Sequence, residues 1–129
     1  MRLWERYHEA FAELEAQDAV TRPTVPAHCR HNAHMYYLLV SRPELRDPLL
    51  EELERGGVNS VFHYVPLHSS PAGRRFGRAE GVLGVTDTVS SCIIRLPLWV
   101  GMGEQAVERV AAAVHDALRI LGRRRVAAT

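Results

Sequence analysis

The chain has 129 residues, the length of one domain or of part of a larger one. Hydrophobic residues make up 47% and charged residues 24%, a composition typical of a globular protein. The formal net charge of +1 argues against a strongly basic surface for nucleic acid or for an anionic membrane.

Cysteine content and hydropathy indicate the cellular compartment of the protein. Cys29 and Cys92 are too few for a disulfide framework, so we expect both to be reduced, small and buried. The N-terminus has no apolar signal segment, and no apolar run is long enough to span a bilayer. These features predict a cytoplasmic protein that does not contact a membrane.

The first 40 residues alternate between regular and irregular segments. Apolar residues recur at helical spacing over residues 2–17, which predicts an amphipathic helix. No capping residue precedes this helix, as in a chain cut inside a longer helix. Pro23 and Pro26 make residues 18–30 a loop. Residues 33–40 are apolar and aromatic on both faces, which indicates a central strand.

Residues 43–65 contain a second helix and a second expected strand. Leucines at helical spacing predict a helix over residues 43–55, which Gly56 and Gly57 end. Pro48 either is tolerated early in this helix or delays its start by one turn. Residues 58–65 are rich in β-branched and aromatic residues, which favours a strand.

The second half of the chain is irregular at first. Residues 66–85 contain prolines and glycines and read as a loop, followed by a short helix over residues 86–92. A strand over residues 92–98 and a long amphipathic helix over residues 104–121, ended by Gly122, complete the pattern. Three short strands with helices predict an α/β (α+β) two-layer sandwich with a small, mostly antiparallel sheet.

Five of the seven histidines lie between positions 28 and 68, where they can serve as acids, bases or metal ligands. A metal site is the first interpretation, because His31 and His34 are three residues apart, His63 and His68 are five apart, and Cys29 is near. On a strand, such spacings point side chains to opposite faces. The pattern therefore disfavours metal.

A structural role is the second interpretation of these histidines. A histidine beside aromatic residues in a strand is often a core residue with one hydrogen bond. We favour this role for His8, His28 and His115. For the histidines of the expected strands it remains an open alternative to ligand binding.

Three sequence blocks suggest a third interpretation. They are His31–Tyr37, Val61–Gly73 and Arg95–Leu98. Their order and spacing resemble the C-terminal part of the DegT/DnrJ/StrS family of sugar aminotransferases, over about residues 28–103. They look closest to the transaminases that convert dTDP-4-keto-6-deoxy-glucose to a dTDP-4-amino-4,6-dideoxy sugar, such as dTDP-4-amino-4,6-dideoxygalactose.

The resemblance implies a domain organisation. Residues 1–17 would be part of the interdomain helix, and residues 18–129 would form the small domain of a fold-type-I aminotransferase. These enzymes hold pyridoxal phosphate (PLP) as a Schiff base on a lysine. All sixteen basic residues of this chain are arginine. The resemblance therefore implies that a large domain, absent from this chain, binds PLP, and that this fragment alone is inactive.

The resemblance also implies a reaction and a set of substrate-binding residues, but no catalytic residue. The reaction is amino transfer from glutamate to the 4-keto carbon of a dTDP-4-keto-6-deoxy-hexose, in polysaccharide biosynthesis. His34 would contact the nucleotide sugar, and Tyr64 and His68 would lie near the mouth of the same cleft. Arg95 would suit the carboxylate of the amino donor, with a structural ion pair as the alternative. His63 is expected to face away from Tyr64.

The expected partners are the nucleotide-sugar substrate, the PLP-binding large domain if the enzyme is split, and a second copy in a homodimer. The alternative is a non-catalytic remnant that serves as a binding or interaction module. Its former large-domain interface would then be an exposed apolar patch. The candidate residues for that patch are Trp4, Tyr7, Phe11 and Trp99.

Overall fold

Three antiparallel strands form the only sheet within residues 1–127, the part of the chain that the computed structural model describes. Their order is β1 (Val20–Thr21), β2 (Tyr36–Val40) and β3 (Ile93–Leu96). β2 is the central strand, as predicted. Helices flank this small sheet, which confirms the predicted α/β sandwich.

The two faces of the sheet differ in burial, because successive side chains of a strand point to opposite faces. One face packs into the core and carries Tyr36, Leu38, Val40, Ile94 and Leu96. The other face is only half-buried and carries Tyr37, Leu39, Ile93 and Arg95. The second face is therefore an open surface on which side chains can meet a ligand or another domain.

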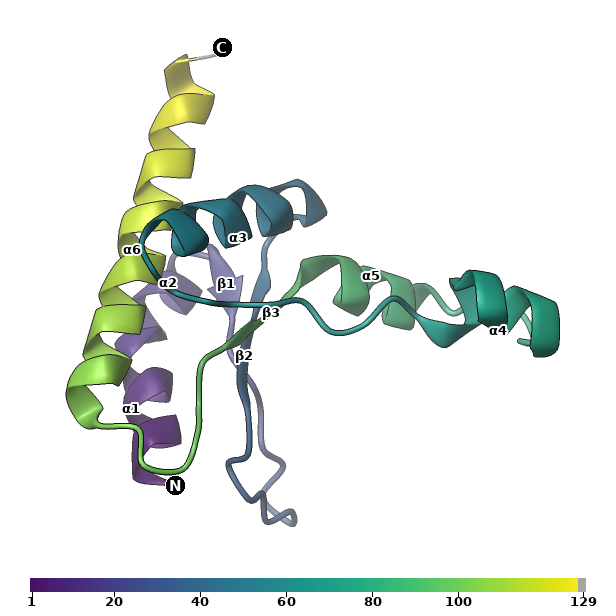
Figure 1. The fold of residues 1–129 in the computed structure, drawn as a ribbon, viewed down its shortest axis with the longest axis horizontal. Helices are drawn as coiled ribbons and strands as arrows, with labels where there is room; N and C mark the ends of the chain where they lie inside the picture. The colour runs from purple at the N-terminus through teal and green to yellow at the C-terminus, as the bar shows by residue number, and fades with distance from the viewer. Residues whose placement is uncertain (128–129) are drawn as a thin grey trace.

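The helices of the core layer are α1 (Arg2–Ala10), α2 (Ala12–Ala16), α3 (Arg46–Arg55) and α6 (Glu104–Ala127). α1 and α6 run side by side along one side of the sheet (Figure 1). The expected first helix is interrupted only at Phe11, where the backbone leaves helical geometry.

The prediction of an exposed apolar patch is wrong for its three residues on the first helix. Trp4, Tyr7 and Phe11 are buried, because α1 packs this face against α6 and the sheet. Trp99 is exposed, as proposed.

Only one of the two cysteines is buried, although we expected both to be. Cys92 is buried, whereas Cys29 is exposed because it lies in the loop before β2.

α3 begins and ends as its sequence indicates. A 3-10 turn (η1, Pro43–Leu45) precedes α3, so the α-helix is delayed and Pro48 falls in its first turn, where no intrahelical N–H is needed. At the other end Gly57 has φ +75°, and the N–H of Val58 donates to the carbonyl of Leu53 at 2.8 Å. This left-handed cap ends the helix.

The strand expected over residues 58–65 is wrong. Only Val61 pairs with the sheet, through an isolated antiparallel bridge to Arg95. The third strand is instead β1, which consists of two residues before Pro23 and so has no readable alternation. α6 also continues past Gly122, where we expected it to end.

Residues 59–91 form an extension that we call the arm. It contains η2 (Leu67–Ser69), α4 (Pro71–Phe76) and α5 (Gly84–Cys92), whose last residue leads into β3. The arm projects away from α6 and α1 (Figure 1), and none of its residues is buried. α4 was not expected; Ser70 caps it by accepting a hydrogen bond from the N–H of Gly73 at 2.9 Å.

Candidate functional site

Arg95 and His63 meet on the open face of the sheet. Arg95 lies on β3, and its Nη1 is 2.7 Å from Nδ1 of His63. Because a guanidinium only donates, Nδ1 of His63 accepts, and the neutral ring then carries its proton on Nε2. The partner of Arg95 is thus an imidazole and not the carboxylate that the ion-pair alternative expects.

Tyr64 extends this cluster outward. Its ring stacks on His63 with centroids 4.4 Å apart and planes 11° apart, and it is 71% exposed. The expectation that the two side chains face opposite ways is wrong, because this segment is not paired as a strand. His63, Tyr64 and Arg95 together offer a guanidinium, an imidazole N–H and a phenol at one place.

A groove of about 510 Å³ continues from the cluster into the arm. One wall is the segment from His63 to Leu67, and the other is formed by α5 and Ile93 of β3. The wall residues from α5 are Val85, Thr86, Val89 and Ser90. The groove is therefore largely apolar, with polar side chains on both walls.

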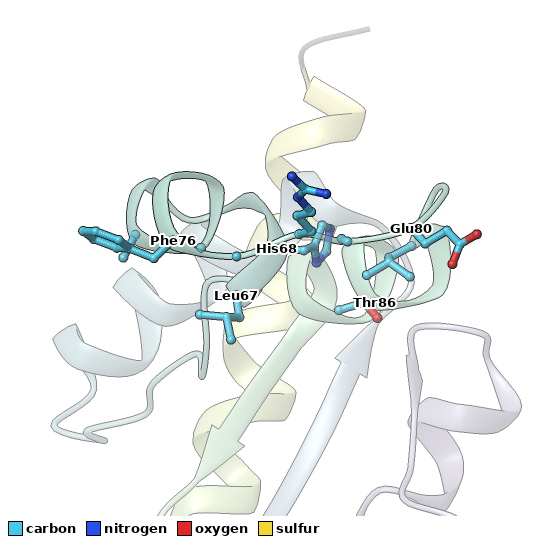
Figure 2. Close-up of a pocket in the computed structure, with 11 residues that line it drawn as sticks. Leu67, His68, Phe76, Glu80 and Thr86 are labelled. Carbon is cyan, nitrogen blue, oxygen red and sulfur yellow. The ribbon is translucent and has the colours of Figure 1, made fainter.

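His68 lies in a second pocket, of about 620 Å³, between η2, α4 and α5. Figure 2 shows His68 near the middle, with Leu67 and Phe76 to one side and Glu80 and Thr86 to the other. Its Nε2 is 3.0 Å from Oδ1 of Asp87 on α5. This contact joins η2 to α5, and a ligand of His68 would have to compete with Asp87.

Gly73 explains the close approach of α4 to η2. A Cβ at this position would lie 1.6 Å from the carbonyl oxygen of Leu67. Any side chain there would push the two segments apart, so the pocket around His68 needs a glycine.

His34 is separate from the other three predicted residues. It is exposed at the end of the loop before β2, and this loop and the arm extend in different directions from the sheet (Figure 1). The backbone N–H and Nδ1 of His34 lie 3.3 Å and 2.7 Å from Oδ1 of Asn32. The structure thus brings Tyr64 and Arg95 together and leaves His34 and His68 at two other places.

An aromatic cluster connects the loop before β2 to α1. Trp4 stacks on His8 at 4.8 Å and meets the rings of His31 and Tyr36 edge-on, at 4.5 Å and 5.3 Å. Burial lowers the pKa of His8, and the Arg22 guanidinium lowers it further, while Glu15 acts in the opposite direction. Burial also raises the pKa of the Tyr36 phenol. These contacts fit the structural role that we favoured for His8, whereas His28, for which we favoured the same role, is exposed.

The sequence analysis did not select three residues that contact the predicted site residues. These are Asn32, His63 and Asp87. Asn32 stands within the His31–Tyr37 block, and an asparagine often accepts a hydrogen bond from the backbone N–H two positions on, in an Asx turn. Asp87 had no comparable signal, because its contact with His68 joins segments that the sequence does not relate.

The described residues do not fit PLP. The chain has no lysine to form a Schiff base, and the lining of both pockets is mainly apolar. Within residues 1–127, no three His, Cys, Asp or Glu side chains gather closely enough to hold a metal ion. No helix in that range is both long and apolar enough to cross a membrane.

Two solved structures share this fold over most of the chain. The aminotransferase TlmJ from Streptoalloteichus hindustanus is 26% identical, with a TM-score of 0.79 over 93% of this chain and 31% of its own. A DegT DnrJ EryC1 StrS aminotransferase from Brucella abortus is 29% identical, with a TM-score of 0.72 over 89% of this chain and 29% of its own.

Two relatives identified by sequence also match most of this chain. An uncharacterized protein of Methanocaldococcus jannaschii is 32% identical over 84% of this chain and 28% of its own length. The dTDP-3-amino-3,4,6-trideoxy-alpha-D-glucose transaminase of Micromonospora megalomicea is 26% identical over 88% and 30%. The chain therefore spans less than a third of these two relatives. Residues 1–115 match the DegT/DnrJ/EryC1/StrS aminotransferase family, and this chain belongs to that family.

Proposed function

We propose that this chain forms the small-domain wall of the substrate cleft in a PLP-dependent sugar aminotransferase. The observation that carries the proposal is the open sheet face, where Arg95, His63 and Tyr64 meet at the head of an apolar groove. The family match supports the reaction class. The chain's share of its relatives' length supports its being a part of the enzyme.

The substrate that we propose is a dTDP-4-keto-6-deoxy-hexose, with glutamate as amino donor. The relative from Micromonospora megalomicea is named as a transaminase of a dTDP sugar, which supports the nucleotide class. One N–H of the Arg95 guanidinium donates to His63, and its remaining N–H groups suit the carboxylate of glutamate. Tyr64, His68 and His34 are the proposed contacts to the nucleotide sugar, and they lie at three separate places on the chain.

PLP would supply the electron sink for amino transfer. Because this chain provides no Schiff-base lysine, we place the cofactor on a large domain, in the part of the relatives that this chain does not span. The role of the chain's own residues is to bind and orient the sugar and to exclude water. On this proposal the chain alone has no transaminase activity.

The arm is the surface that we propose for contact with the large domain. Its exposed large apolar side chains include Tyr64, Val65, Leu67, Phe76, Val82 and Val85. A segment with no buried residue and this many exposed apolar side chains is typical of an interface. A second copy of the enzyme could contribute to the same surface in a homodimer. Both cysteines are free, which supports the cytoplasm as its compartment.

Complementation tests the proposal. The chain would be mixed with the separately expressed large domain of TlmJ, and amino transfer from glutamate to dTDP-4-keto-6-deoxy-glucose would be measured with PLP present. We expect turnover only in the mixture, and no aldimine absorbance band when PLP is added to the chain alone. Arg95→Ala should reduce the turnover, and Arg109→Ala, on α6, is the matched control. Absence of turnover under conditions where TlmJ is active would favour the non-catalytic interaction module.

A further inference from the structure

The hydrogen-bond network around Asn32 assigns the proton on the His34 ring. Oδ1 of Asn32 lies 3.3 Å from the backbone nitrogen of His34, which can only donate. The atom facing it is therefore the amide oxygen and not the amide nitrogen. The same oxygen lies 2.7 Å from Nδ1 of His34, so Nδ1 must donate to it. The neutral ring then has its proton on Nδ1 and a lone pair on Nε2.

The backbone of the turn maintains this contact. Ala33 has φ +52°, in the left-handed region, and this conformation brings the side chain of Asn32 back onto His34. Trp4 holds the turn on both sides, since its buried ring contacts His31 before the turn and Tyr36 after it. His34 itself is exposed, so its Nε2 can reach a ligand.

We propose that Asn32 is a positioning residue, which presents Nε2 of His34 as a hydrogen-bond acceptor for a hydroxyl group of the sugar. A phosphate oxygen is itself an acceptor and does not match this lone pair. His34 thus selects the pyranose ring and not the diphosphate of a nucleotide sugar. The identity of the ligand rests on the function proposed above, whereas the position of the proton does not.

Nitrogen NMR of the imidazoles tests the proton position on the chain alone. The spectrum of ¹⁵N-labelled chain would be recorded about two pH units above the ordinary imidazole pKa of about 6.5, so that the rings are neutral. The signals of His34 are those lost in His34→Gln. We expect a protonated Nδ1 and an unprotonated Nε2, the reverse of the tautomer that free histidine prefers.

Three variants sharpen this test. Asn32→Ala removes the acceptor, and its His34 should return to the Nε2–H form. Asn32→Asp keeps an acceptor oxygen and should keep the proton on Nδ1. Asn59→Ala changes the chain's other asparagine, which is also exposed, and should leave His34 unchanged. An Nε2–H ring in the unmodified chain, or an Nδ1–H ring that persists in Asn32→Ala, would overturn the proposal.

The ligand is tested in the complemented enzyme. Asn32→Ala should raise KM for dTDP-4-keto-6-deoxy-glucose about tenfold, or about 1.4 kcal/mol, with less change in kcat. Asn32→Asp should restore KM. An unchanged KM together with a changed tautomer would overturn the sugar hydroxyl as the ligand. A complete lack of turnover would instead count against the proposed function and leave the NMR result standing.

Discussion

The hydroxyl of Tyr7 makes a contact that connects two distant segments of the chain. It donates to the carbonyl of Pro97 at 2.8 Å and so joins α1 to the segment after β3. Burial raises the pKa of this phenol, which keeps it protonated and able to donate. The contact holds the first helix to the rest of the core.

Tyr7→Phe should therefore destabilise the chain. The ring would still fill its site, but the Pro97 carbonyl would lose its donor, at a cost of about 1–2 kcal/mol in the free energy of unfolding. Urea unfolding followed by circular dichroism measures the change. Tyr64→Phe, at the exposed tyrosine of the arm, should change the free energy by less than about 0.5 kcal/mol. Equal effects of the two changes would contradict the role of the Tyr7 hydroxyl.

His8 should make stability depend on pH below neutrality. Burial lowers its pKa in the folded chain, so the unfolded chain binds the proton first as the pH falls. The free energy of unfolding then decreases as the pH drops through the ordinary histidine value of about 6.5. His8→Gln should flatten this dependence between about pH 7.5 and 5.5, a window set around that value. Urea unfolding across this range measures it, and His28→Gln, in the exposed loop, is the control.

Two glycines, one within α6 and one just after α3, should respond in opposite ways to substitution by alanine. A Cβ at Gly122 in α6 or at Gly57 after α3 would meet no atom within 4 Å, so space does not distinguish them. Gly122 is helical, and Gly122→Ala should stabilise by about 0.5–1 kcal/mol. Gly57 has φ +75°, and Gly57→Ala should cost about 1–2 kcal/mol. Thermal and urea unfolding report both, and the same sign for both would contradict the backbone argument.

The core helices and the central strand were predictable because their patterns are local, whereas α4 was not predicted. Periodic leucines and paired glycines predict α3, and apolar residues on both faces predict β2 as the central strand. β1 was not predictable, because two residues carry no period. The prediction of a strand over residues 58–65 is wrong although the composition of this segment favours β structure. Only Val61 pairs with the sheet.

The arrangement of the candidate site was not predictable from the sequence. The three sequence blocks propose His34, Tyr64, His68 and Arg95, which stay predictions, but spacing along the chain does not say which of them meet. Arg95 finds His63 across 32 positions, a contact set by the Val61 bridge. Asp87, which contacts His68, lies in a helix that the sequence defines only weakly.

The exposed apolar surface of the arm should govern how the whole molecule associates. Phe76 and Val82 are 79% and 92% exposed, so Phe76→Ser combined with Val82→Ser removes apolar surface without opening the core. We expect less self-association in sedimentation velocity, with the free energy of unfolding unchanged within about 0.5 kcal/mol. Val100→Ser, at a fully exposed position outside the arm, is the control. Self-association that survives in the double variant would show that the arm is not the associating surface.

The buried residues Val58 and Cys92 flank the arm, and every residue between them is at least partly open to water. The denaturant dependence of unfolding scales with the surface that unfolding newly exposes. Side chains that are already exposed add little to that surface. We therefore expect a weaker denaturant dependence of unfolding than for a chain of 129 residues buried throughout.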